Sequence, residues 1–473
     1  MRKLEKNELI TVAIEDIGFD GAGIGKKDRY AIFIKDAVIG DTVYARIMKA
    51  KQNYAYAKLE KVITPSSFRV TPKCEFHRQC GGCQLQALSY DKQLSYKQNK
   101  VRNNLIRIGG FMPELVDSVT QPIIGMDEPF RYRNKAQYPV GYSKNGCLTT
   151  GFYAGRTHDI VANTDCLLGD ERNKAVLEAV LAYMKANNVT AYREQAGTGL
   201  ARHIFIRSGF YSGEIMVCLV INAKNKANLP RQQDLIESLR EIPGMVGLTL
   251  NYNPDKTNII MGKKMETLWG KETLSDWLYL REPEKGFVKT GESISVKLSP
   301  LSFYQVNPIQ AEKIYSLALN YAQLEGKETV WDLYCGIGTI SLFVSGKAKK
   351  VYGVEIVPEA VCDARKNALE NKIDNVAFFA GKAEAVLPEK LSEGAKADVI
   401  IVDPPRKGCN AECLDIMIKI KPKRIVYISC DSATLARDLR IICENGYELK
   451  KWRAVDQFGQ TVHIETVCLV ERK

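Results

Sequence analysis

The sequence predicts an α/β protein whose C-terminal third forms a doubly wound parallel sheet, joined to an N-terminal β-barrel and a central α+β domain. From about residue 301 onward, apolar strands alternate with helical segments, which is the pattern of βαβ units. The first 65 residues instead hold short β-like runs between glycine-rich turns. We therefore expect three domains, over residues 1–65, 66–300 and 301–473.

The N-terminal barrel is predicted from five short segments at regular spacing. They cover residues 10–14, 18–25, 30–34, 41–47 and 56–62. Strands this short and this close together favour a small barrel. Pro65 and Pro72 then bracket a linker, because proline interrupts regular structure.

The central domain is expected to open with a cysteine-rich stretch and a helix over residues 90–107, a segment rich in Lys, Gln and Tyr. Alternating runs at 203–207 and 215–221 then indicate strands of a mixed α+β arrangement. This pattern continues to about residue 300.

The C-terminal domain is predicted from five apolar strands and a clear helix. The helix covers residues 359–371 and separates the second strand from the third. The strands cover residues 329–333, 350–355, 376–380, 399–403 and 424–429.

Composition restricts the class of protein. The formal net charge is +12, from 67 Lys and Arg against 55 Asp and Glu, which suits a polyanionic partner without proving one. No stretch approaches the roughly 20 apolar residues of a membrane span, and residues 1–8 lack the apolar run of a secretory signal. We expect a cytoplasmic protein, whose 13 cysteines are mostly reduced thiols.

A cofactor site is predicted at the first strand-to-helix turn of the C-terminal domain. Its glycines, in residues 330–338, let the backbone approach a ligand. Ser341 stands where a dinucleotide-binding turn prefers glycine, and the carboxylate of Asp332 would repel a pyrophosphate. Asp332 suits the cationic groups of S-adenosylmethionine, and Glu355 can accept both ribose hydroxyls. The turn therefore favours S-adenosylmethionine over NAD.

Two further strand ends carry reactive side chains. Asp403 opens the segment Asp-Pro-Pro-Arg-Lys-Gly after the fourth strand, at the sheet edge where open α/β sheets bind ligands. Cys430 ends the fifth strand directly before a helix, whose N-terminus favours the thiolate. Downstream, Glu465 offers a carboxylate and His463 an imidazole.

At these motifs the sequence resembles the RNA uracil-5-methyltransferase family, class I enzymes that use S-adenosylmethionine. The matching segments are DPPRKG at 403–408, YISCD at 427–431, HIET at 463–466 and SFYQVNP at 302–308. Residues 1–65 look like a TRAM domain, an RNA-binding barrel of OB type. The branch that acts on large-subunit (23S) ribosomal RNA is the closer match, because the transfer RNA branch lacks both that domain and the cysteine cluster.

The resemblance implies a 23S rRNA (uracil-5-)-methyltransferase. Thiolate addition of Cys430 to carbon 6 of uracil would make carbon 5 nucleophilic, and Glu465 would then remove the proton from carbon 5. Asp403 is expected to orient the base or the cofactor. The contacts to S-adenosylmethionine that the resemblance implies are Gln305, Tyr334, Glu355 and Asp403. The family often has a proline where this chain has Gly459, which puts the rigidity of that loop in question.

Three cysteines stand close together at Cys74, Cys80 and Cys83. A four-thiolate site holds zinc or an iron–sulfur cluster, and three thiols in a loop without a metal are a further alternative. The resemblance favours a 4Fe-4S cluster and points to Cys166 as the fourth ligand, with Cys147 as the second candidate. We expect such a cluster to pin a loop used for RNA binding.

Two segments are candidates for RNA contact. Residues 130–135 interleave aromatic and basic side chains, as a stacking and phosphate-binding surface does. The basic residues of the 90–107 helix, Lys97, Lys100, Arg102 and Arg107, could either contact RNA or form a solvated helix face. No obligate protein partner is expected. Two rival functions are a methyltransferase of an exocyclic base amino group and a catalytically inactive RNA-binding or ribosome-assembly protein.

Overall fold

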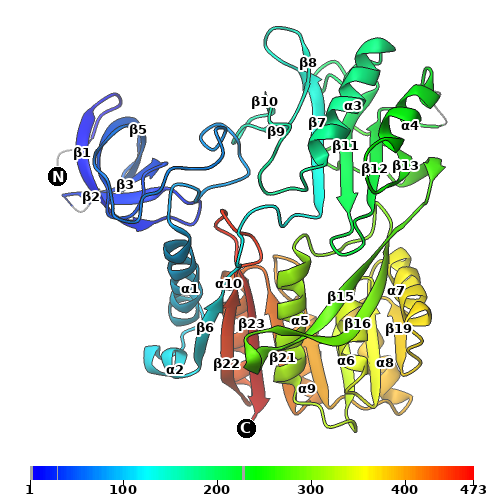
Figure 1. Ribbon diagram of the computed structural model, residues 1–473. Helices are drawn as coiled ribbons and strands as arrows, with labels where there is room; N and C mark the ends of the chain where they lie inside the picture. Colours follow the sequence, from blue (N-terminus) through cyan, green and yellow to red (C-terminus); the bar gives the residue numbers. More distant parts are fainter. Residues whose placement is uncertain (1–3, 29, 226–228) are drawn as a thin grey trace.

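The computed structural model describes residues 4–28, 30–225 and 229–473. It has three parts: an N-terminal barrel, a central sheet with helices, and a C-terminal sheet with helices on both faces (Figure 1). A long helix, α1 (Tyr90–Arg107), leads from the barrel to the side of the C-terminal sheet. Among the described residues, no helix combines the length and the apolar character that crossing a bilayer requires.

The N-terminal barrel is closed and has the expected five strands. Its core consists of every second residue along the strands, such as Ile10, Val12 and Ile14 of the first strand. Strand order around the barrel is β1-β2-β3-β5-β4. The strands are β1 (Leu9–Ile17), β2 (Gly23–Lys27), β3 (Tyr30–Lys35), β4 (Thr42–Ala50) and β5 (Tyr54–Thr64).

The central part is a six-stranded sheet with two helices against it. Its strands run in the order β14-β13-β12-β11-β7-β8, and the helices are α3 (Asn173–Ala186) and α4 (Gln232–Arg240). The strands are β7 (Lys135–Tyr142), β8 (Leu148–Thr150), β11 (Ala201–Ser208), β12 (Ile215–Ile221), β13 (Met245–Tyr252) and β14 (Lys264–Gly270). A small pair, β9 (Phe152–Tyr153) and β10 (Ile160–Val161), lies beside it.

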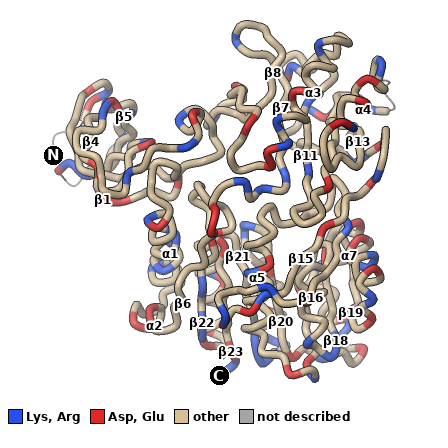
Figure 2. Tube along the Cα trace, viewed as in Figure 1, with Lys and Arg blue, Asp and Glu red and all other residues tan. Residues whose placement is uncertain are grey.

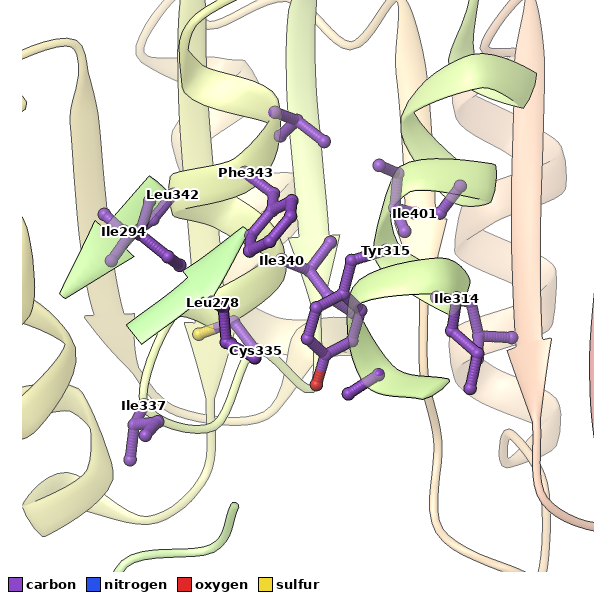
Figure 3. Close-up of a cluster of buried hydrophobic side chains, with 14 of the residues drawn as sticks. Leu278, Ile294, Ile314, Tyr315, Cys335, Ile337, Ile340, Leu342, Phe343 and Ile401 are labelled. Atoms are coloured by element: carbon purple, nitrogen blue, oxygen red, sulfur yellow. The ribbon is translucent and has the colours of Figure 1, made fainter. Parts of the chain in front are cut away.

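A two-stranded ribbon connects the central part to the C-terminal sheet. It consists of β15 (Leu274–Glu282) and β16 (Val288–Leu298), joined by a short 3-10 turn, η1 (Pro283–Lys285). The ribbon covers α5 (Pro308–Ala322) and contributes Leu278 and Ile294 to the core beneath it (Figure 3). In this core the rings of Tyr315 and Phe343 meet edge to face, with centroids 5.5 Å apart.

The C-terminal sheet has eight strands in the order β19-β18-β17-β20-β21-β23-β22-β6. Five of them are parallel, as the sequence predicts: β17 (Thr329–Leu333), β18 (Lys350–Glu355), β19 (Val376–Ala380), β20 (Val399–Val402) and β21 (Arg424–Ser429). The remaining helices are α6 (Thr339–Ser345), α7 (Pro358–Glu370), α8 (Ala383–Ser392), α9 (Ala411–Ile420) and α10 (Ser432–Glu444).

The three strands beyond β21 make this sheet mixed rather than purely parallel. Strand β23 (Glu465–Arg472) is antiparallel to both β21 and β22 (Tyr447–Val455). Strand β6 (Thr120–Ile124) then pairs in parallel with β22 and completes the sheet. The neighbouring helix α2 (Pro113–Ser118) places Val116 in the same core as α1. Residues 90–124 therefore pack with the C-terminal sheet, although the sequence assigned them to the central domain.

Candidate active site

Four parallel strands bring most of the expected site residues to one edge of the sheet. Asp332, Glu355, Asp403 and Cys430 lie at or just beyond the carboxyl ends of β17, β18, β20 and β21. Glu465 reaches the same edge from the opposite direction, because β23 begins there and Ser429 pairs with Thr466. The topology thus brings together side chains that are up to 133 residues apart in sequence.

The turn after β17 is shaped for close approach to a ligand. Gly336 and Gly338 both have positive φ, at 54° and 84°, and a Cβ on Gly338 would lie 2.8 Å from the ring of Phe378. The backbone N–H of Gly336 donates to Glu355 Oε2 at 3.1 Å, and that of Val357 donates to Oε1 at 3.0 Å. These bonds fix the Glu355 carboxylate beside the turn. Tyr334, also at positive φ, precedes the turn.

The buried carboxyl of Asp332 explains why serine replaces glycine in this turn. Ser341 Oγ donates to Asp332 Oδ2 at 2.6 Å, while Oδ1 has no hydrogen-bond partner. Burial and the nearby Asp403 raise the pKa of Asp332 to about 7, against the lowering effect of Ser341. A buried carboxyl oxygen without a partner, at the edge where ligands bind, is suited to a cationic group.

Gln305 lies in the segment before α5. Its Oε1 accepts a hydrogen bond from Gln457 Nε2 at 3.2 Å, and its carbonyl accepts one from Asn134 Nδ2 at 3.1 Å. Asn307 caps α5, because its side chain accepts from the N–H of Gln310. The segment is therefore tied to the central part and to the loop before β23.

Cys430, Glu465 and Asp403 form an acidic group, and the cation of Arg406 lies beside it. Burial raises the pKa of Cys430 to about 12, as do the charges of Glu465 and Asp403, while Arg406 opposes the shift. Burial and Asp403 likewise raise the pKa of Glu465 well above its usual value. Burial also raises the pKa of Asp403, to about 7. Each carboxyl thus has a raised affinity for a proton.

The sequence predicts that the helix N-terminus favours the Cys430 thiolate, whereas burial and the nearby carboxyls raise the pKa of this thiol. The cap of α10 is Asp431, whose Oδ1 accepts from the N–H groups of Ala433 at 2.9 Å and Thr434 at 3.1 Å. This carboxylate satisfies the amides that would otherwise stabilise a thiolate. The imidazole of His463 offers no cation either, because burial and several cations, Arg406 foremost, lower its pKa to about 4.

The four cysteines Cys74, Cys80, Cys83 and Cys166 line a single cavity of about 240 Å³. Burial raises the pKa of all four thiols. Cys147, the second candidate for fourth ligand, is exposed and does not line this cavity. The described residues contain no group of three or more His, Cys, Asp or Glu placed to hold a metal ion.

The two segments considered for RNA contact differ in the structure. The stretch from β6 to β7, which crosses the middle of the molecule, carries several basic positions (Figure 2). Within it Arg131 pairs with Asp165 and buried Tyr132 donates to the carbonyl of Gly459 at 3.0 Å. On α1, Lys97 is neither solvated nor available to RNA, because it forms a buried ion pair with Asp456.

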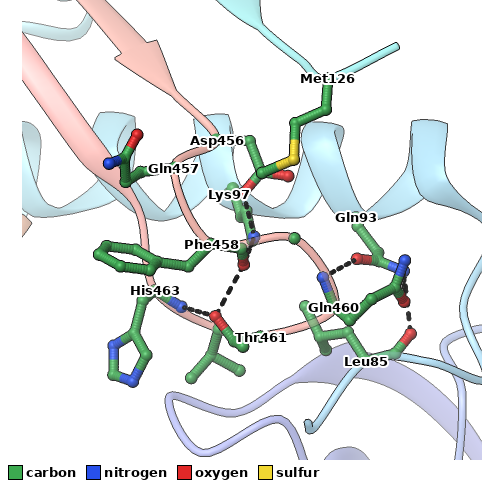
Figure 4. A network of polar contacts seen from close by, with 12 residues as sticks. Leu85, Gln93, Lys97, Met126, Asp456, Gln457, Phe458, Gln460, Thr461 and His463 are labelled. Carbon is green, nitrogen blue, oxygen red and sulfur yellow. Dashed lines mark hydrogen bonds and ion pairs between the residues drawn. The ribbon is translucent and has the colours of Figure 1, made fainter. Parts of the chain in front are cut away.

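Sequence reasoning missed the role of the loop at residues 456–464, between β22 and β23. The sequence of α1 nevertheless indicated that such a loop exists, because Gln93 and Lys97 continue the four-residue spacing of the buried Val101 and Leu105. A polar pair on an apolar helix stripe indicates buried polar partners. Those partners lie in this loop, as Figure 4 shows.

Comparison with known proteins agrees with this geometry. The profile of the family described as tRNA (Uracil-5-)-methyltransferase matches residues 285–473, and that of the TRAM domain matches residues 3–59. An RNA methyltransferase of Clostridium tetani is 44% identical over 99% of this chain and 97% of its own. One of Halalkalibacterium halodurans is 44% identical over 99% of this chain and 98% of its own.

A solved structure shares the whole architecture. It is the tRNA (uracil-54, C5)-methyltransferase of Pyrococcus abyssi in complex with S-adenosyl-L-homocysteine, with a TM-score of 0.74 and 23% identity over 98% of this chain and all of the other. Fold, family profile and full-length relatives agree with the resemblance seen in the sequence. The chain belongs to the tRNA (uracil-5-)-methyltransferase family and is an S-adenosylmethionine-dependent RNA methyltransferase with an N-terminal TRAM domain.

Proposed function

We propose that this enzyme methylates carbon 5 of uridine in large-subunit ribosomal RNA through a covalent adduct with Cys430. The observation that carries the mechanism is the meeting of Cys430 and Glu465 at one sheet edge, on neighbouring antiparallel strands. A thiol and a carboxyl so close together are the two groups that substitution at carbon 5 of uracil requires.

The two groups act in sequence. The Cys430 sulfur adds to carbon 6, and the displaced ring electrons make carbon 5 nucleophilic. Carbon 5 then attacks the methyl group that bound S-adenosylmethionine would supply, and the methyl–sulfur bond breaks so that neutral S-adenosylhomocysteine leaves. Glu465 then removes the proton of carbon 5, the electrons of that C–H bond form the carbon 5–carbon 6 double bond, and the sulfur leaves carbon 6 as a thiolate.

The raised pKa values suit these roles in the loaded enzyme. Glu465 is a stronger base than an exposed carboxylate, because burial raises its pKa. Cys430 needs positive charge nearby to ionise, and Arg406 supplies some of it. A bound sulfonium would add to that charge. For cofactor binding we propose Glu355 as ribose acceptor, with Gln305, Tyr334 and Asp403 as further contacts.

We further propose that Cys74, Cys80, Cys83 and Cys166 hold a 4Fe-4S cluster. Thiolates are the usual ligands of such clusters, and the cavity that these residues share far exceeds the space of a single zinc ion. The cluster would cross-link residues 74–83 to residue 166. Anaerobically purified protein should be brown and contain iron and sulfide, and Cys80→Ser should lower its iron content. Stoichiometric zinc without iron would contradict the cluster.

The proposal of a ribosomal substrate rests on the cysteine cluster that the sequence shares with the large-subunit branch. The TRAM barrel does not separate the two branches, because the tRNA enzyme of Pyrococcus abyssi shares the whole architecture. Mapping of 5-methyluridine by mass spectrometry, in ribosomal and transfer RNA from cells with and without the gene, tests this assignment. We expect one or more uridines of the large-subunit RNA to lose the methyl group. Loss from position 54 of transfer RNA instead would assign the substrate of the Pyrococcus abyssi enzyme.

The covalent mechanism has its own test. Cys430→Ala should abolish methylation, whereas Cys362→Ala, at an exposed cysteine, should leave it unchanged. RNA that contains 5-fluorouridine should trap a covalent complex with the wild-type enzyme, because fluorine cannot leave carbon 5 as a proton. A methyltransferase of an exocyclic amino group would retain its activity in Cys430→Ala, and an inactive RNA-binding protein would not methylate at all.

A further inference from the structure

The loop at residues 456–464 leads directly into Glu465. Side chains of helix α1 contact this loop from its first residue to Val462. Lys97 Nζ lies 2.5 Å from Asp456 Oδ1 and donates to the carbonyl of Phe458 at 3.0 Å. One turn further along the helix, Lys100 Nζ donates to the carbonyl of Val462 at 3.1 Å. These contacts span the loop from its first residue to three residues before Glu465.

A second contact from α1 fixes the middle of the loop. Gln93 Nε2 donates to Gln460 Oε1 at 3.1 Å, and the N–H of Gln460 donates to Gln93 Oε1 at 3.2 Å (Figure 4). Gln93, Lys97 and Lys100 are four and three residues apart, so all three lie on the same face of the helix. One face of the helix therefore makes all of these contacts to the loop.

The ion pair at the start of the loop is fully enclosed. The side chains of Lys97 and Asp456 are both 0% exposed. The second oxygen of Asp456 accepts from the hydroxyl of Tyr90 at 2.8 Å, so each carboxylate oxygen is bound by a residue of α1. A buried pair of this kind fixes geometry more than it adds stability, because desolvation offsets much of its attraction.

The cysteine-rich segment also docks on this loop. The backbone N–H groups of Gln84 and Leu85, which follow Cys83, both donate to the carbonyl of Gln460 at 3.0 Å. Val462 packs in a small apolar cluster with Ile17 of the barrel and with Leu85 and Leu88. Helix α1, the barrel and the cysteine-rich segment therefore all contact the loop that leads into Glu465.

We propose that α1 is a positioning element for Glu465, acting through the buried Lys97–Asp456 pair and its contacts to the 456–464 loop. This inference rests on the proposed role of Glu465 as the base. Lys97 touches neither RNA nor cofactor in this role. It sets the place of the carboxylate that takes the proton from carbon 5, and so acts only after the sulfur has added and the methyl group has moved.

The timing of that step provides the test. Lys97→Met/Asp456→Asn removes the pair without leaving a buried charge unpaired. With 5-fluorouridine RNA, which needs no proton removal, we expect the variant to form the covalent complex within about threefold of the wild-type rate. With uridine RNA we expect turnover to fall by about 10- to 100-fold, less than the full contribution of a general base. A methylated protein–RNA complex should accumulate on denaturing gels.

Asn99→Ala, at an exposed residue of the same helix, serves as the matched control and should leave both reactions unchanged. If the double variant fails to fold, Lys100→Met, which removes the bond to Val462, makes the same comparison. Unchanged turnover, or an equal fall in both reactions, would overturn the inference. Failure of the wild-type enzyme to form the fluorouridine complex would instead refute the proposed function, and the inference with it.

Discussion

At the scale of single residues, the sequence indicated the reactive side chains but not their electrostatic state. Cys430, Glu465, Glu355 and Asp403 could be placed at one edge because parallel strands end together. The raised pKa of Cys430 could not be foreseen, since it depends on burial and on carboxyls that only the fold brings near. The hydrogen bond from Ser341 to Asp332 could not be predicted either, although the sequence showed that Ser341 replaces a glycine of dinucleotide-binding turns.

The pKa of Asp332 predicts how cofactor binding depends on pH. A carboxyl must be ionised to pair with the cationic groups of S-adenosylmethionine, so binding favours the deprotonated form. Because the pKa of Asp332 in the free enzyme is about 7, affinity should rise with pH and be about tenfold weaker at pH 6 than at pH 8.

Isothermal titration calorimetry across this range measures the effect. Asp332→Asn should bind S-adenosylmethionine more weakly and keep only the pH dependence that comes from Asp403. Asp415→Asn, at an exposed ion pair of α9, should behave as the wild type. A flat profile in the wild-type enzyme would contradict the assignment of Asp332 as a cation partner.

At the scale of elements, periodicity located the strands of the barrel, the five parallel strands and α1. It did not locate β6, β22 or β23 as parts of one sheet. Strand β6 has only five residues and contains Pro122, so its pattern is too short to indicate a strand. Its place is decided by long-range contacts, such as the bond from Trp452 Nε1 to the carbonyl of Val116 at 3.0 Å.

The caps of two helices provide a paired prediction. Asp431 caps α10 and Asn410 caps α9, each by accepting backbone N–H bonds. Asp431→Ala and Asn410→Ala should each lower the free energy of unfolding by about 1 kcal/mol, measured by urea denaturation. Only Asp431→Ala should also lower methylation, since it moves the end of the strand that carries Cys430. Equal activities in the two variants would show that the α10 cap does not position the thiol.

At the scale of the whole molecule, the division into three domains by sequence does not coincide with the units of packing. Residues 301–473 alone would leave the edge of β22 unpaired and remove Val101, Leu105 and Val116 from their core. We expect this fragment to aggregate and to lack a cooperative thermal transition by circular dichroism, whereas the full chain shows one. A fragment that unfolds cooperatively and binds S-adenosylmethionine would contradict this view.

The pairing of β6 with β22 also has a consequence for how the protein is made. Pro122 and Arg453, which are hydrogen-bonded across this pair, are 331 residues apart. At typical rates of translation, β6 leaves the ribosome roughly 20 to 60 s before its partner exists. During that interval the apolar side chains of the nascent segment must be shielded, so its synthesis creates a defined window in which chaperones can act.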